Sequence, residues 1–467
     1  MSDLQTILGT LVILAPLALM MLLGSASLIG LPLSERAAAR AVAVATSVGL
    51  SATLGVFAFM ISTDVRHVVV SFGDWLHLEA EPPAQSYHFA VRFVFDRLSL
   101  PFVALTYVLF GTIGAFATRY MHREAGWNRF FTLYAVFLAG MVLAGLAGTI
   151  ETLFLGWELV GIASAFLVGF FQDRPAPVRN ALRIWIVYRI SDAALLLAAL
   201  SLHHMSGGGD FDKLTGYRET AGVSPLELRS WPIGGSELTS LQVLVVGGLL
   251  ILAAAAKSAL IPFSGWLPRA MEGPTPSSAV FYGALSVHLG AYLLLRIDPL
   301  IDASPILSVV IAVLGLATAA YAAIVARVQT DIKSALSFAS LTQVGLIVAE
   351  IGFGWRYIPL VHLMGHACLR TLQFVRAPSF LRDHRATENA IGQRIARPPT
   401  SVFGLWLYRF ALERGYFDAL IDRCIVTPIV GICRSLDRLD RHATRFLHDE
   451  SKAVEADAVA AKQELTV

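Results

Sequence analysis

The stretch LLILAAAAKSALIPFSGWLPRAMEGPTPSS, residues 249–278, decides the fold. It begins as an apolar helix of small residues and carries one lysine, Lys257. Four prolines follow the lysine: Pro262, Pro268, Pro274 and Pro276. Because each proline removes a backbone donor, the helix breaks here, and freed carbonyls with nearby water can lie inside a membrane. We therefore predict a broken membrane helix near residues 257–276, with a buried cation beside the break.

The composition of the whole chain is that of a membrane protein. Of its 467 residues 56% are hydrophobic and only 15% are charged, and the mean hydropathy is +0.64. Soluble domains carry about 25% charged residues, so the deficit argues against several soluble domains. The net charge of +2 indicates no nucleic-acid partner. Because Cys368, Cys424 and Cys433 lack the spacing of a metal site, we expect no cofactor in this chain.

Apolar runs of about 20 residues, long enough to span a bilayer, recur along the chain. They are residues 7–31, 41–62, 98–118, 130–149, 150–171, 181–203, 241–260, 277–296, 305–326, 334–353 and 358–375. The predicted fold is an all-α polytopic membrane protein with about 11 transmembrane helices. The first run lacks a basic n-region, which favours a retained span over a cleaved signal peptide.

Charges alternate between successive loops. Arginines follow the first, third and fifth spans, whereas the loops at 63–97 and 204–240 are acidic. By the positive-inside rule, the N-terminus lies outside and the arginine-rich tail lies in the cytoplasm. We expect a multi-pass protein of a bacterial inner membrane.

The tail after residue 376 has no clear span. Residues 401–412 and 416–433 are apolar but interrupted by charges, which is typical of interfacial helices or a short hairpin. The next segment places four arginines on one helical face: Arg434, Arg438, Arg441 and Arg445. Two interpretations stay open, a helix on an anionic membrane surface and a solvated helix that pairs with its own aspartates.

Ionisable residues inside the predicted spans carry the functional argument. A charge at the bilayer centre costs at least ~2.5–3.5 kcal/mol, so such residues usually line an ion path. A buried lysine can lower its pKa enough to load and release protons, although Lys257 could also snorkel to the interface. Glu158 lies mid-span, where a short side chain cannot snorkel, so it needs a basic partner or a raised pKa. Two interpretations of Glu158 stay open: a role in a proton relay and a purely structural ion pair.

Further polar groups share helix faces. Arg189 and Asp192 are spaced i,i+3 and can pair with each other, either as a structural pair or as part of a relay. His362, His366 and Arg370 repeat every four residues and form a stripe that can carry protons, since histidine titrates near neutral pH. Asp331 and Lys333 lie at a predicted cytoplasmic entrance, as a gate or as an interfacial pair.

Six segments stand in a specific order: FDRLSL (95–100), FLGWELVGIASAFLVGFF (154–171), VYRISDA (187–193), AAKSALIPFSGWLPRAMEGPTPSSA (255–279), VQTDIKSALSFASLTQVGL (328–346) and HLMGHACLR (362–370). Through them the chain resembles, over roughly residues 90–375, the antiporter-like membrane subunits of respiratory complex I (the L-type chain) and of Mrp Na+/H+ antiporters. The resemblance implies two inverted five-helix repeats, each with a broken helix and a central lysine.

The resemblance also implies roles for single residues. Glu158 and Lys257 would be the ion pair and relay of the first half-channel, and Asp192 a coupling carboxylate. His362 and His366 would belong to a central hydrophilic axis. Where the family often has a histidine after GPTP this chain has Tyr282, with His288 further along the same helix.

Other departures from the family concern the second half-channel. Arg370 stands where the family often has lysine, and the second broken helix has no counterpart, so the inverted repeat looks truncated. We expect four regions: N-terminal spans and an external loop (1–97), a first antiporter-like repeat (98–296), a partial second repeat (297–376) and a tail (377–467).

The short form of this resemblance is most like a DabB-type subunit of an inorganic-carbon accumulation complex. It implies H+ or Na+ flow that energises an obligate partner, a large DabA-like protein that carries the zinc this chain lacks. Two alternatives stay open: an L-type subunit of a complex I-like or Mrp antiporter-like complex, and a non-conducting membrane scaffold. In each case the chain has no catalytic centre of its own and contacts lipid.

Overall fold

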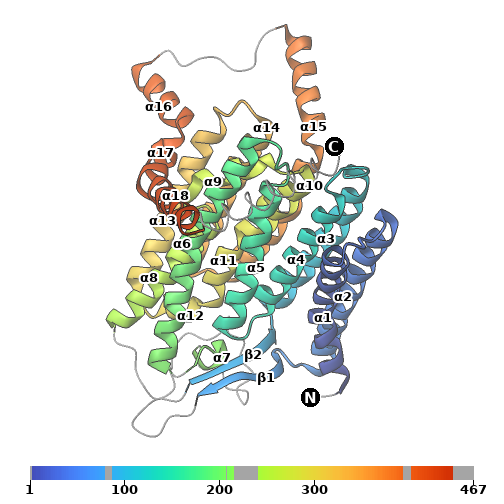
Figure 1. The fold of residues 1–467 in the computed structure, drawn as a ribbon. Coiled ribbons are helices and arrows are strands. Elements are labelled where there is room, and N and C mark those ends of the chain that lie inside the picture. The colour runs from blue at the N-terminus through green and yellow to red at the C-terminus, as the bar shows by residue number, and fades with distance from the viewer. Residues whose placement is uncertain (1–2, 79–86, 207, 215–239, 393–400, 445–467) are drawn as a thin grey trace. The chain divides into compact units, whose positions relative to one another are not determined.

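The computed structural model describes residues 3–78, 87–206, 208–214, 240–392 and 401–444. The chain divides into two compact units, residues 1–417 and 418–467. The first unit is a bundle of long helices, most of which run side by side (Figure 1).

Ten helices of the described residues are long and apolar enough to cross a membrane. They are α1 (Asp3–Leu28), α2 (Glu35–Thr63), α3 (Ser99–Tyr120), α4 (Trp127–Leu146), α5 (Ile150–Val168), α6 (Pro175–Ser206), α8 (Ser240–Lys257), the continuous stretch Thr275–Arg296, α13 (Pro305–Ala326) and α14 (Ile332–Gly352). The predicted multi-pass helical fold is therefore confirmed. The eleventh predicted run lies within α15 (Tyr357–Ile391), whose polar stripe lowers its hydropathy.

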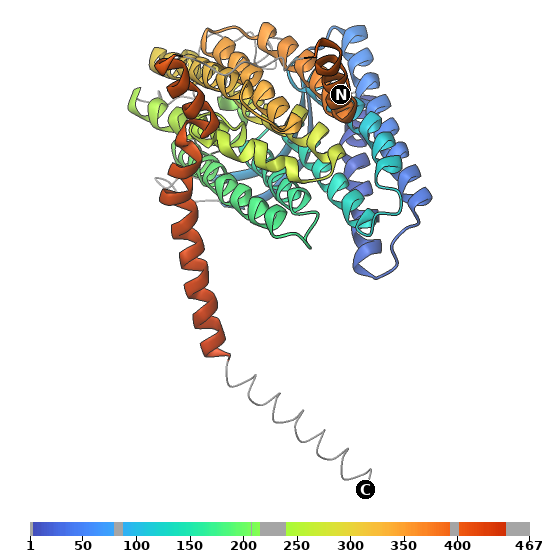
Figure 2. The same cartoon turned by 90° about the horizontal axis from the view of Figure 1, so that it is seen from above.

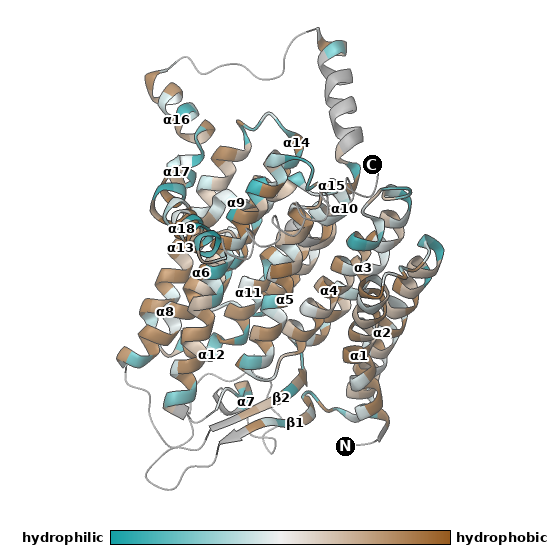
Figure 3. Cartoon of the chain, in the orientation of Figure 1, coloured by the Kyte–Doolittle hydropathy of each residue, from teal (hydrophilic) through white to brown (hydrophobic). Residues whose placement is uncertain are grey.

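Apolar side chains on the outer faces of these helices remain exposed. Phe57 on α2, Leu200 on α6 and Val309 on α13 are each more than half exposed. Figure 3 shows hydrophobic residues along the helices and hydrophilic residues at the turns between them. This pattern fits a bundle whose outer surface faces lipid, where apolar exposure carries no penalty.

The N-terminal pair α1 and α2 lies at one edge of the bundle. Figure 2 shows the pair beside α3 and α4, away from α6 and α8. The pair is fixed partly by Tyr107, whose hydroxyl donates to the carbonyl of Val12 at 2.5 Å.

A β-hairpin covers one end of the bundle, where the sequence analysis expected only a loop. Strands β1 (Val68–Leu78) and β2 (Tyr87–Phe95) pair antiparallel, with Val68 opposite Phe95 and Val70 opposite Phe93. These four side chains are buried and share one face of the hairpin, since alternate residues of a strand point to the same face.

The hairpin is tied to the turn between α4 and α5. The Gly148 amide donates to the carbonyl of Arg92 at 2.8 Å, and Ile150 N donates to the carbonyl of Gly209 at 2.8 Å. Short helix α7 (Phe211–Leu214) follows, and Asp212 contacts His67 at 3.0 Å. We call β1, β2, residues 147–149 and residues 208–214 the hairpin cap (Figure 1).

The predicted break is present between α8 and the next span. Helix α8 ends at Lys257 and is followed by three short turns of helix, η3 (Phe263–Gly265), α9 (Trp266–Arg269) and η4 (Ala270–Glu272). The chain then re-enters the bundle as α10 (Thr275–Ser277), the π-helix η5 (Ser278–Leu285) and α11 (Ser286–Arg296). Short helix α12 (Asp298–Asp302) leads to α13.

Past α15, the chain forms α16 (Val402–Leu412), η6 (Arg414–Tyr416), α17 (Phe417–Ile421), η7 (Asp422–Val426) and α18 (Thr427–Ala443). Arg434, Arg438 and Arg441 lie on α18 and are exposed, and Arg441 pairs with Asp437 at 2.9 Å. Arg445 lies outside the described residues. Helix α15 continues past residue 376, where the sequence analysis ended the partial repeat; the four predicted regions stay a prediction.

Helices α13 and α14 touch through backbone, which yields a prediction on stability. A Cβ at Gly345 would lie 2.6 Å from the Ala319 amide nitrogen and 2.7 Å from the Gly315 carbonyl oxygen. Neither backbone atom can move without separating the helices, so Gly345→Leu should lower stability by about 1–3 kcal/mol or more. The thermal midpoint of the detergent-solubilised protein measures this. Gly24→Leu is the matched control, because a Cβ at Gly24 meets nothing within 4 Å; an equal midpoint for both variants would contradict the prediction.

Candidate functional site

Lys257 lies at the end of α8 and is fully buried. Its Nζ donates to the carbonyl of Trp157 at 2.8 Å and lies 4.4 Å from the ring centre of Tyr188. Nζ also lies 5.1 Å from the ring centre of Trp157. The ammonium group is thus held by one carbonyl and two aromatic faces, so the snorkelling interpretation is wrong for this structure.

Four carbonyl oxygens near the end of α8 accept hydrogen bonds. The Ser258 amide donates to the Ala254 carbonyl, and the Leu260 amide to the Ala255 carbonyl, both at 2.9 Å. Two side chains donate to the neighbouring carbonyls: Ser191 Oγ to that of Ala253 and Trp266 Nε1 to that of Ala256. Because a helix end inside a membrane must satisfy its own carbonyls, these contacts stabilise the break that places Lys257.

Glu158, Arg189 and Asp192 form one ionic cluster between α5 and α6. Arg189 donates to both oxygens of Glu158, at 3.1 and 2.7 Å. The same guanidinium contacts Asp192 Oδ2 at 2.6 Å. The predicted Arg189–Asp192 pair is therefore formed, and the same arginine also bridges to the mid-span carboxylate.

The expected direct pair between Lys257 and Glu158 is not formed. Within the described residues Lys257 has no ion pair, since Arg189 occupies the Glu158 carboxylate. The residues are nevertheless neighbours: Lys257 Nζ binds the carbonyl of the residue that precedes Glu158. A Cβ at Gly161, one turn further along α5, would lie 3.1 Å from Nζ, so glycine leaves room for the lysine head.

A second polar cluster joins η5–α11 to α15. His288 Nε2 lies 2.9 Å from His366 Nδ1, and both rings are buried. Arg370 donates from Nε to His366 Nε2 at 3.4 Å and from Nη1 to Gln373 Oε1 at 2.7 Å. The structure thus brings three predicted residues together across two helices, next to the π-helix that precedes α11.

His362 has its own partners, which the sequence analysis missed. Its Nδ1 lies 2.8 Å from Glu350 Oε1, and its Nε2 lies 3.0 Å from Gln343 Oε1. Glu350 stands three residues before the end of the predicted span 334–353, in LIVAEIG, where a charge is ordinary, so the sequence did not single it out.

The two clusters approach each other through small residues. A Cβ at Gly290 on α11 would lie 2.3 Å from Ser258 Oγ, directly after Lys257. His288 precedes Gly290 by two residues, so the break in α8 packs against the helix that carries the histidine. Ser258 and Ser286 are both buried in this region.

Asp331 and Lys333 play separate parts at the start of α14. Asp331 is the N-cap residue, and its carboxylate accepts from the Ser334 amide at 2.8 Å. Lys333 Nζ lies 3.5 Å from the carbonyl of Met271 in the break. The two side chains form no salt bridge in the described part of the chain, and both a gate and an interfacial pair stay predictions.

No group of three or more histidine, cysteine, aspartate or glutamate residues with metal-site geometry occurs among the residues that the structure describes. The three cysteines, all of them described, are exposed and unpaired.

Comparisons with known proteins agree with this architecture. Residues 147–397 match the family described as "NADH:quinone oxidoreductase/Mrp antiporter, TM", and residues 82–131 match "NADH-Ubiquinone oxidoreductase (complex I), chain 5 N-terminus". Among solved structures, the Mrp complex from Dietzia sp. aligns with a TM-score of 0.62 at 24% identity, covering 85% of this chain and 39% of that chain. The membrane-bound sulfane sulfur reductase, an archaeal respiratory membrane complex, aligns with a TM-score of 0.66 at 18% identity, covering 79% and 70%.

Curated relatives point the same way. The chain is 29% identical over 350 residues to NAD(P)H-quinone oxidoreductase chain 5 of Picosynechococcus sp., covering 74% of this chain and 51% of the relative. It is 32% identical over 290 residues to NADH-ubiquinone oxidoreductase chain 5 of Schizophyllum commune, covering 62% and 40%. The chain thus spans about half the length of the curated relatives it matches. Because the first family match takes in more than half of its residues, the chain belongs to the antiporter-like membrane subunits of the NADH:quinone oxidoreductase and Mrp antiporter family.

Proposed function

We propose that this chain is a cation-translocating subunit of a larger membrane complex, with H+ as the first candidate ion and Na+ as the alternative. The observation that carries the proposal is the buried Lys257 beside the Glu158–Arg189–Asp192 cluster, at a break in a membrane helix. Ionisable groups are expensive inside a bundle that faces lipid, so a cluster of four supports an ion path.

The chemistry of the cluster favours protons. Its members are a lysine, two carboxylates and an arginine, and the lysine and the carboxylates are side chains that can bind and release a proton. One guanidinium serves both carboxylates, so protonation of either Glu158 or Asp192 leaves Arg189 to the other. Protonation removes one negative charge from the cluster, and Lys257 responds to this loss because buried charges are weakly screened. In this way the movement of a proton is coupled to the position of the Arg189 side chain.

The His288–His366 pair supplies a second stage of the same path. Two neutral rings at 2.9 Å can share one proton, and Arg370 disfavours a second positive charge beside it. His362 continues the stripe along α15 towards Glu350. Asp331 and Lys333 stand at the end of α14 that meets the break.

A partner complex is part of the proposal. The relatives above are chains of quinone oxidoreductases and of an Mrp complex, and we propose that this chain likewise works with further subunits. These comparisons support the complex I-like or Mrp-like alternative better than the inorganic-carbon role expected first. A DabB-type subunit with a zinc-carrying DabA-like partner is a finer proposal. The proteins that co-purify with this chain distinguish the two proposals. A zinc protein would favour the DabB-type subunit, whereas iron–sulfur or quinone-reducing chains would favour the redox complex.

The direct test uses Glu158→Gln. The amide keeps the shape of the side chain but cannot take up a proton, so cation flux should fall by about tenfold or more, equivalent to at least about 1.4 kcal/mol in the barrier. The chain is purified with its co-purifying subunits and reconstituted into vesicles that enclose a pH-sensitive dye. Glu124→Gln is the control, because Glu124 is exposed at the α3–α4 turn.

Wild-type flux in an assembled Glu158→Gln complex would contradict this role for Glu158. Wild-type function in a double variant of Glu158 and Lys257 would instead favour the scaffold alternative. A Na+ gradient that changes the flux at constant pH would identify Na+ as the ion.

A further inference from the structure

A second acid–base pair lies at the start of α5, outside the clusters described above. Glu151 Oε1 and His203 Nε2 are 2.5 Å apart, and their side chains are only 16% and 5% exposed. His203 stacks on Phe89 with ring centres 4.7 Å apart and an angle of 13° between the planes. None of the proposed steps uses this pair.

The contacts of His203 orient its ring towards Glu151. Its Nδ1 lies 2.9 Å from the carbonyl oxygen of Ala199, which can only accept, so Nδ1 carries a hydrogen. Nε2 is then the nitrogen that faces the Glu151 carboxylate. An imidazole nitrogen and a carboxylate held this close can exchange a proton.

The pair is placed on the same face of α5 as Glu158. Seven residues separate Glu151 from Glu158, which is two helical turns and about 10.5 Å along the axis. Both carboxylates line one groove of about 880 Å³ between α5 and α6, and so does His203. The groove is otherwise mostly apolar, with Phe154, Leu196 and Leu200 among its walls.

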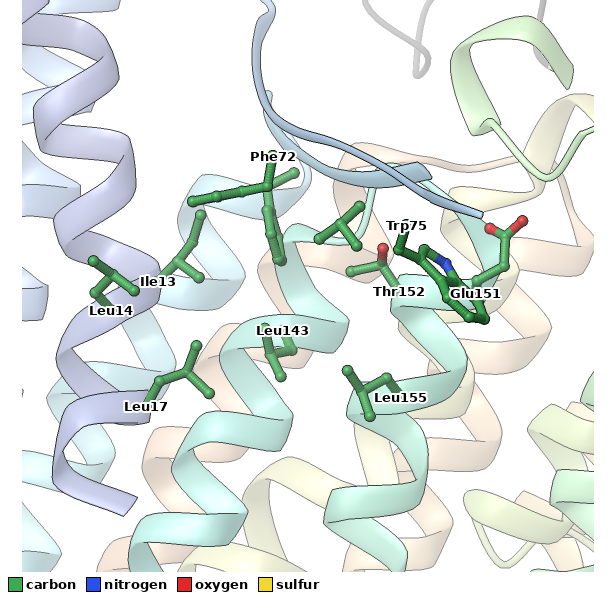
Figure 4. A pocket seen from close by; sticks show the side chains of 11 residues that line it. Ile13, Leu14, Leu17, Phe72, Trp75, Leu143, Glu151, Thr152 and Leu155 are labelled. Atoms are coloured by element: carbon green, nitrogen blue, oxygen red, sulfur yellow. The ribbon is translucent and has the colours of Figure 1, made fainter. Parts of the chain in front are cut away.

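The other end of the pair meets the hairpin cap. A Cβ at Gly209 would lie 2.6 Å from Glu151 Oε1 and 2.7 Å from Oε2, so the cap backbone covers the carboxylate. Figure 4 shows a neighbouring cavity of about 610 Å³, which is lined by Glu151, Trp75 and Leu155 among others. In this view Glu151 lies near Trp75 below strand β1, and Leu155 lies further along α5. Among the described side chains, titratable groups on the surrounding elements include His204 on α6, Asp74 on β1, Arg92 on β2, and Asp210 and Asp212 in the cap. Arg92 pairs with Asp210, and Asp212 pairs with His67.

We propose that Glu151 and His203 form the proton-loading site for Glu158 at the hairpin end of the bundle. The inference rests on the proposed function. A proton held by the pair leaves Oε1 or Nε2, passes along water molecules in the groove and binds a carboxylate oxygen of Glu158. A proton from water at the cap then replaces it. Only O–H and N–H bonds form and break. Water in a mostly apolar groove needs polar partners, which Ser201 and His204 supply in the lining beside Glu151, His203 and Glu158.

The test compares this buried pair with an exposed pair of the same chemistry. Glu35 Oε2 and His122 Nδ1 are 2.6 Å apart, but both side chains are more than one third exposed. Glu151→Gln and His203→Gln should each lower proton flux by about tenfold, with the reconstituted complex still assembled. They should also lower, by about one unit, the pH at the hairpin side at which the flux is half-maximal. Without the loading site, protonation of Glu158 requires a higher proton concentration. Glu35→Gln and His122→Gln should change neither quantity.

The outcomes separate the inference from the function it rests on. An unchanged flux and an unchanged pH of half-maximal flux in Glu151→Gln and His203→Gln overturn the loading site, whatever Glu158→Gln does. If Glu158→Gln is also unchanged, the proposed function fails as well. If the single variants do not assemble, the double variant Glu151→Leu with His203→Leu removes both polar partners together, which proteins tolerate better than an orphaned charge. Flux must be low in that variant, and wild-type flux would overturn the proposal.

Discussion

Replacing Lys257 with methionine should abolish cation flux while the complex still assembles. Methionine is unbranched and similar in length, so it fills the site between Trp157 and Tyr188 without a cavity. Methionine has no charge and no exchangeable proton. The Glu158–Arg189–Asp192 cluster therefore loses the neighbouring ammonium group that responds to protonation of its carboxylates. We expect a loss of about 100-fold or more, equivalent to about 2.7 kcal/mol or more.

A second substitution at the same position separates proton exchange from fixed charge. Lys257→Arg keeps a positive charge, but a guanidinium does not release its proton in proteins. If Lys257 exchanges protons, the arginine variant is nearly as inactive as the methionine variant. Activity in Lys257→Arg would reassign the lysine to a fixed electrostatic role.

Flux into dye-loaded vesicles measures these changes, and Arg40→Met is the control for loss of an exposed cation. Equal subunit ratios in the purified complexes establish that assembly is intact. Wild-type flux in Lys257→Met would contradict both the role of the lysine and the relay built on it.

The spans and the break could be predicted because both follow from local physics. A bilayer requires about 20 apolar residues per helix, and prolines end helices wherever they stand. The hairpin was missed because its two strands, of 11 and 9 residues, are shorter than a span, lie between spans and resemble a loop in a hydropathy profile. VVVSF and FAVRFVF are rich in valine and phenylalanine, which are typical of strands, but they show no clear alternation of apolar and polar residues.

The members of the candidate site could be predicted, but not their pairing. Lys257, Glu158, Arg189 and Asp192 stand out as charges within apolar runs. Which carboxylate pairs with which cation depends on how α5, α6 and α8 are rotated about their axes. This rotation is set by the packing of the helices and cannot be read from the sequence of one helix. Arg189 reaches Glu158 on a different helix as well as Asp192 on its own.

Residues near span ends were the second source of error. Asp96, Arg296 and Glu350 lie within a few residues of predicted boundaries, where a charge is ordinary. The structure buries Asp96 and Arg296 almost completely, because the two side chains pair where the start of α3 meets the end of α11, directly after strand β2. The burial of a residue at a span end depends on its neighbours in the fold, which a hydropathy profile does not contain.

The Asp96–Arg296 pair leads to the largest expected effect on stability. Arg296 Nη1 donates to Asp96 Oδ2 at 2.5 Å, and Arg296 Nη2 donates to Tyr292 at 2.7 Å. The other carboxylate oxygen, Oδ1, accepts from the amides of Leu98 at 2.9 Å and Ser99 at 2.7 Å, at the start of α3. Arg296→Met leaves a buried carboxylate without its cation, so it should destabilise the chain by about 3–5 kcal/mol.

The pH dependence of this loss distinguishes an orphaned charge from poor packing. Burial by itself raises the pKa of Asp96, but Arg296 and the Ser99 amide hold that pKa below its ordinary value. A carboxyl with a lowered folded-state pKa stabilises the fold above its unfolded pKa of about 3.9, and this contribution is lost as the pH falls further. Without Arg296 only burial and the amides remain, the pKa rises, and acid then relieves the variant by protonating Asp96. The difference between wild type and Arg296→Met should therefore shrink as the pH is lowered.

Thermal midpoints of the solubilised protein at several pH values test this reasoning. Asp96→Asn combined with Arg296→Met should recover part of the loss, because an amide needs no cation. Arg66→Met is the matched control: Arg66 is 47% exposed, its partner Asp64 is 91% exposed, and such pairs contribute about 0–1 kcal/mol. A loss in Arg296→Met that does not vary with pH, and that Asp96→Asn does not relieve, would mean that packing of the arginine side chain outweighs its charge. In that case the pair would join α3 to α11 by shape, and the polar chemistry of the bundle would be confined to the clusters around Lys257 and His288.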